Sequence, residues 1–128
     1  MSSALAQLDS IQQIPQLVQQ RLSFVASLSV RASEVAQHAL SAWDSWSVEE
    51  INSSLELARD ILNQTSRTAI SIGYEDLGVT AHHCAAQIIA HLEGDYADLA
   101  VCPGEIIWFV DTFVEACDAI ADTDWSPR

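Results

Sequence analysis

Apolar residues recur every three or four positions along most of the chain, which is the spacing of one face of an α-helix. A proline is favoured in the first turn of a helix, so Pro15 predicts a helix that begins there and runs to about residue 43. A separate short helix is predicted before it, over Ser3–Gln12. The inward positions of the 15–43 helix are Leu17, Phe24, Val25, Leu28, Ala32, Val35, Ala39 and Trp43.

The second helix is predicted over 47–72. Ser47 and Glu50 have the spacing of a capping box, in which each residue satisfies a free backbone amide of the other. The apolar positions that follow alternate spacings of four and three, which is typical of a seam against a neighbouring helix. They are Ile51, Leu55, Ala58, Leu62, Thr65, Ala69 and Ile72. Gly73 is well placed to end this helix.

Two further helices are predicted over 76–92 and 103–121, the latter beginning at Pro103. We expect a loop over Asp95–Cys102 and a loose tail over Thr123–Arg128. The inward positions are Leu77, Ala81, Cys84, Ala85, Ile88 and Leu92 in the third helix, and Ile106, Phe109, Val110, Phe113, Cys117 and Ile120 in the fourth.

These patterns predict an all-α protein: a single domain over 1–128, built as an up-down four-helix bundle with a short extra N-terminal helix. At 1.5 Å per residue, the first two bundle helices would be about 40 Å long and the last two about 25–30 Å. The longer pair therefore has apolar surface that the shorter pair cannot cover. The N-terminal helix, a bend near Ser27–Ser33 or a second chain would have to cover it.

The chain has 18 Asp and Glu residues against five arginines and no lysine, for a formal net charge of −13. Because nucleic-acid binding needs clustered basic residues, and the arginines here are scattered, we expect no nucleic-acid partner. Anionic membranes are disfavoured for the same reason, and no run of about 18 apolar residues predicts a membrane span. The N-terminus lacks the features of a signal peptide, so we expect a cytoplasmic protein.

The acidic residues of the fourth helix have a particular arrangement. Asp111, Glu115, Asp118 and Asp122 follow spacings of four, three and four, which places them on one face, and Trp108 points to the same side. Like charges at this spacing destabilise a helix by about 0.2–0.5 kcal/mol per pair. An outward tryptophan rimmed by carboxylates is typical of an interface anchor with a steering field. The alternative is a solvated face kept acidic for solubility, with the indole covered by the N-terminal segment.

No other group of residues predicts chemistry. The three cysteines are an odd number without a C-x-x-C pair, which indicates neither a disulfide framework nor a zinc site. His82 and His91 fall on opposite flanks of the third helix and His83 points outward, so we expect no metal and no cofactor. There is no glycine-rich phosphate loop and no G-x-S-x-G motif, so we expect no enzyme.

The segment from Ala81 to Ala86, AHHCAA, resembles the histidine phosphotransfer motif. The resemblance implies that His82 is a phospho-acceptor in a phosphorelay. Members of that family follow the histidine with a lysine and a small residue, where this chain has Ala85 and Ala86.

The leading hypothesis is a small acidic protein–protein interaction module (an inhibitor, immunity protein or adaptor) that binds a basic surface of a partner protein. The residues expected to bind are Trp108, Asp111, Glu115, Asp118 and Asp122. The alternatives are a histidine phosphotransfer-like domain and a structural homodimer.

Overall fold

The chain folds into four helices in a computed structural model, which describes residues 2–94, 97–99 and 102–124, with side chains from residue 16 to residue 123. The helices are α1 (Ser2–Asp44), α2 (Val48–Ser71), α3 (Glu75–Glu93) and α4 (Gly104–Asp124). There is no strand in the described ranges. The predicted all-α class is therefore confirmed.

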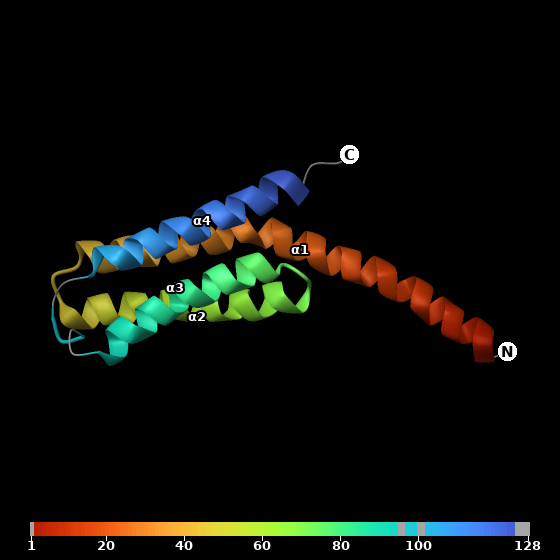
Figure 1. Ribbon diagram of the computed structural model, residues 1–128, viewed down its shortest axis with the longest axis horizontal. Helices are drawn as coiled ribbons and strands as arrows, with labels where there is room; N and C mark the ends of the chain where they lie inside the picture. Colours follow the sequence, from red (N-terminus) through yellow and green to blue (C-terminus); the bar gives the residue numbers. More distant parts are fainter. Residues whose placement is uncertain (1, 95–96, 100–101, 125–128) are drawn as a thin grey trace.

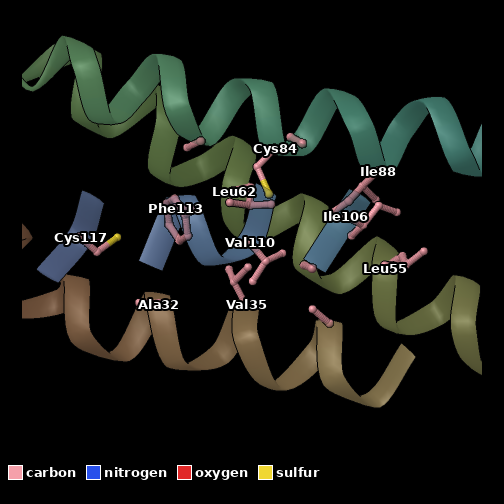
Figure 2. Packing of buried hydrophobic residues seen from close by; sticks show 14 of the residues in the cluster. Ala32, Val35, Leu55, Leu62, Cys84, Ile88, Ile106, Val110, Phe113 and Cys117 are labelled. Atoms are coloured by element: carbon pink, nitrogen blue, oxygen red, sulfur yellow. The ribbon is translucent and has the colours of Figure 1, made fainter. Parts of the chain in front are cut away.

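Each helix packs against two others. Helix α1 contacts α2 and α4, and α3 also contacts α2 and α4, so the four helices surround a common core (Figure 1). Apolar side chains from all four helices meet in this core (Figure 2). Phe113, Leu28, Ile51, Leu62, Leu77 and Ile88 are among its largest fully buried members. Burying a side chain of this size stabilises the fold by about 1.5–3 kcal/mol.

Local residues fix both ends of α2. Ser47 has an extended backbone, and its Oγ accepts a hydrogen bond from the Glu50 backbone N–H at 3.5 Å, which is one of the two hydrogen bonds of the predicted capping box. At the other end, the Tyr74 N–H donates to the Ala69 carbonyl at 2.8 Å. Gly73 between them has a φ of 99°, a conformation that side chains disfavour. These contacts turn the chain sharply from α2 into α3.

The predicted short helix over Ser3–Gln12 is not a separate element, because α1 is one helix of 43 residues that passes through Pro15. A proline inside a helix lacks the N–H of one backbone hydrogen bond and crowds the preceding turn, which costs about 3 kcal/mol but does not oblige the helix to end. Helix α1 would be about 64 Å long and α2 about 36 Å. Figure 1 shows the N-terminal part of α1 projecting past the turn between α2 and α3. Of the three ways to cover the apolar surface of the longer helices, a separate N-terminal helix packed on the bundle is therefore not the one that the structure has.

Two predicted inward residues of α1 are exposed. Leu17 lies in the N-terminal part of α1 and is exposed. Trp43 is also exposed, and the neighbouring Ala42 is buried instead. The buried positions 28, 32, 35, 39 and 42 keep alternating spacings of four and three, which excludes residue 43 from the seam.

The end of α4 also differs from the prediction. The helix continues through Asp124, so the first two residues of the expected tail are helical, while 125–128 lie outside the described residues. Of the expected loop, 97–99 and Cys102 are described. The Asn52 side-chain amide ties this loop to α2 by donating to the Ala97 carbonyl at 3.1 Å.

Candidate functional site

The carboxylates predicted to share one face of α4 do so. Asp111, Glu115, Asp118 and Asp122 are all exposed, and we call this group the acidic face. The opposite side of α4 is buried through Ile106, Val110, Phe113 and Cys117 (Figure 2). The core therefore fixes the rotation of α4, and with it the direction in which the acidic face points.

Trp108 lies at the N-terminal end of the acidic face. Its side chain is 63% exposed, and its indole ring packs edge-on against Phe109 with the ring centroids 5.0 Å apart and an interplanar angle of 86°. An edge-to-face pair of this kind contributes about 0.5–1.5 kcal/mol beyond area burial. The start of α4 lies at the end of the bundle away from the projecting part of α1 (Figure 1). Trp108 is thus held at one edge and accessible over most of its surface.

Within the part of the chain that the structure describes, no ion pair involves the carboxylates at the centre of this face. Among the described residues the one ion pair is that of Arg59 with Asp60 on α2, at 3.1 Å. Asp111, Glu115 and Asp118 take part in none. On the core side of α4 the pKa of the Cys117 thiol is raised to about 12, chiefly by burial and also by the charge of Asp118, while Arg31 acts in the opposite direction.

A second group of exposed carboxylates lies on α2. Glu49, Glu56 and Asp60 are all exposed, and Arg59 lies beside them and pairs with Asp60. This group therefore has a basic residue next to it. Exposed apolar side chains also lie near this group: Leu57 is on α2, and Trp46, three residues before Glu49, is exposed as well.

The histidines do not converge. His82 and His83 are exposed on α3 with ring centroids 6.3 Å apart, whereas His91 is buried. Burial lowers the pKa of His91, and its Nε2 has no hydrogen-bond partner within the described part of the chain. The same described ranges contain no group of three or more His, Cys, Asp or Glu residues placed to hold a metal ion.

His82 has surroundings that the sequence did not reveal. It lines a cavity of about 310 Å³ together with Asp60, Asn63, Ser66 and Arg67 of α2. These residues meet only because α2 and α3 pack closely, where the Ser66 hydroxyl donates to the Gly78 carbonyl at 2.7 Å. No sequence spacing could predict this pairing across two helices.

Two arginines of α1 form hydrogen bonds that help to hold the helices together. Arg31 donates from Nε to Ser27 Oγ and from Nη1 to Thr65 Oγ1, both at 2.9 Å, and its guanidinium lies 5.3 Å from the Phe24 ring centroid. Arg21 donates from Nε to the Ile72 carbonyl at 2.9 Å.

Comparisons place the chain in no known group: no protein-family model, no curated protein and no solved structure matches it. Within the described residues, none of the helices has both the length and the apolar character needed to cross a membrane. Function therefore has to be argued from the surfaces described above.

Proposed function

We propose that the protein is a small acidic interaction module, an up-down four-helix bundle that binds a basic surface of a partner protein through the acidic face of α4. The classes that fit are an inhibitor, an immunity protein or an adaptor. The observation that supports the proposal is the exposed Trp108 indole next to three carboxylates (Asp111, Glu115 and Asp118) that form no ion pair with any described residue.

The two parts of this surface have different roles. The carboxylates attract a basic partner over a distance of about 8 Å at physiological salt and raise the rate of productive encounter. Trp108 then supplies apolar area, because tryptophan is among the residues that contribute most to binding energy at the centres of interfaces. The partner should therefore present Lys or Arg side chains around an apolar pocket that accepts an indole.

The test is capture from the native host with three immobilised baits. The first is the wild-type chain, the second has Asp111→Asn, Glu115→Gln and Asp118→Asn, and the third is a control with the same change of charge on α2. The control changes are Glu49→Gln, Glu56→Gln and Asp60→Asn.

We expect the wild type and the α2 control to retain the same basic protein at low salt and to release it at high salt. The α4 variant and Trp108→Ala should not retain it. Equal retention by all of the baits would reject the acidic face as the binding site.

A second function is supported by a separate observation. Arg67 lines the same cavity as His82, and a guanidinium there can stabilise a phosphoryl group in place of the lysine that the phosphotransfer motif lacks at Ala85. In this function the phosphoryl group leaves an aspartyl phosphate of a receiver domain and bonds to an imidazole nitrogen of His82, which restores the aspartate.

Incubation with a phosphorylated receiver domain tests this second function. Label that appears on the wild type and on His83→Gln but not on His82→Gln or Arg67→Gln supports it. Absence of label from the wild type rejects it.

A further inference from the structure

Helix α1 leaves the bundle about halfway along its length. Arg21 marks the point, since its Nε donates to the carbonyl of Ile72 just after the end of α2. Residues 2–20, which we call the overhang, continue α1 by about 28 Å beyond it. Figure 1 shows no other helix beside this part. An isolated helix of this length is marginally stable in water, because most helix stability comes from tertiary packing.

An apolar groove lies at the base of the overhang. Leu17 and Val18 of α1 and Ile70 and Ile72 at the end of α2 line a cavity of about 480 Å³ together with Arg21, Ser71 and Gly73. We call it the junction groove. Leu17, Val18, Ile70 and the adjacent Leu22 are each 46–56% exposed, so four large apolar side chains gather at this end of the molecule. A patch of this kind indicates a contact surface.

The charge of the chain is distributed unevenly between this end and the rest. Residues 1–33 contain Arg21 and Arg31 against one carboxylate, Asp9, and so have a net charge of +1. Since the whole chain has −13, the remainder has −14. Two copies of this chain therefore repel each other over most of their surfaces. The overhang and the junction groove are the region where they can meet with the fewest carboxylates, one in each copy.

We propose that the occupant of the junction groove is the overhang of a second copy of this chain. The two overhangs run antiparallel about a two-fold axis, so that the N-terminal end of each lies in the junction groove of the other. A two-fold contact uses the same surface on both copies, so each overhang occupies the junction groove of the other copy. The helix dipoles also agree, because the positive N-terminus of one overhang meets the negative C-terminus of α2 in the other copy.

The size of the contact sets its strength. A helix face about 28 Å long and 11 Å wide has a projected area of roughly 300 Å², and the junction groove adds to it. This is below the ~800 Å² per partner of a standard stable interface. The proposed dimer is therefore weak, and we expect it to dissociate on dilution through the micromolar range. The acidic face lies on α4 and stays free in both copies, so the dimer does not depend on the proposed partner binding.

The first experiment is sedimentation equilibrium of the full chain over a range of concentrations, in buffer with sodium chloride and in buffer with sulfate. We expect the mass to rise from 14.0 kDa toward twice that value, and to rise more readily in sulfate, which strengthens apolar association. Val18→Glu with Leu22→Glu should keep the chain monomeric.

The matched control is Val30→Glu with Leu57→Glu, which adds the same charge at two comparably exposed apolar positions away from the groove. It should still form the dimer. Far-UV circular dichroism shows whether each variant is folded. A wild type that stays monomeric at all concentrations overturns the proposal, and so does an equal loss of association in both double variants.

A second measurement tests the antiparallel arrangement without disturbing the groove. A spin label on Gln16→Cys should give an intermolecular backbone separation of about 16 Å. In the antiparallel pair, the two copies of position 16 are offset along the helix axis by nine residues, and the two helix axes are about 9 Å apart. The native cysteines are buried and do not compete for the label. The same label on Glu93→Cys should show no short intermolecular distance. A short distance from position 93, or none from position 16, contradicts the arrangement.

Discussion

Neutralising one carboxylate of the acidic face should make the protein more stable. Glu115 lies four residues after Asp111 and three residues before Asp118, so it takes part in two like-charge pairs on α4. Each such pair destabilises a helix by about 0.2–0.5 kcal/mol, and Glu and Gln have nearly equal helix propensities. Glu115→Gln should therefore raise the free energy of unfolding by about 0.4–1 kcal/mol at low salt.

The assay is urea unfolding followed by far-UV circular dichroism at two ionic strengths. Screening lengths fall from about 30 Å at 0.01 M salt to about 3 Å at 1 M, so the gain should largely disappear at high salt. The control is Glu34→Gln, an exposed α1 position with Arg31 three residues before it. That change removes an attraction and should lower stability slightly. A Glu115→Gln variant that is less stable than the wild type at low salt would refute the electrostatic reasoning.

Three further predictions concern the core. Burial lowers the pKa of His91 below its ordinary 6.5, so near that pH the unfolded chain binds a proton that the folded chain does not. The free energy of unfolding should therefore fall as the pH drops below about 6.5. In acid unfolding curves, His91→Gln should show a shallower loss of stability. Gly78→Ala should lower the free energy of unfolding by about 1–2 kcal/mol, because the added methyl group would overlap an α2 side chain. The control is Gly104→Ala, which should not lower it, because no atom lies within 4 Å of the added carbon. Burial raises the pKa of Cys84 and Cys117 to about 12, so a thiol reagent at neutral pH should modify them only after denaturant is added; rapid labelling of the native protein would contradict their burial.

The sequence predicted the helices best where local chemistry and apolar spacing agree. In α2 the Ser47 cap and the regular seam both mark the helix, which runs over Val48–Ser71. In α1 a proline is compatible both with a helix start and with a helix interior, and local pattern cannot distinguish them. The structure joins the two expected helices into one. Because the N-terminal residues continue α1, the overhang and the junction groove are exposed.

The acidic face could be placed from sequence because four positions at helical spacing define a face once the opposite face is apolar. The exposure of Trp108 followed from the same geometry. The cavity at His82 and the junction groove could not be predicted, because each is formed by side chains from two helices. Residues as far apart as Val18 and Ile70 meet only through the packing of α1 against α2.

The acidic face also has a cost that fits a binding role. Its like-charge pairs lower the stability of α4, and the exposed indole leaves apolar area in water. On α2, Arg59 pairs with Asp60 and relieves part of the like-charge repulsion. The carboxylates of α2 therefore serve as a comparison, within the same molecule, for those of the acidic face.

The most direct test is the association rate of the basic protein recovered by the wild-type bait, measured against salt for the wild type, the α4 triple variant and the α2 triple variant. Loss of three steering charges at the binding site should slow association on the order of tenfold at low salt, with the difference vanishing at high salt. The α2 variant should associate at close to the wild-type rate. Equal slowing by the two variants, or rates that do not respond to salt, would contradict binding through the acidic face of α4.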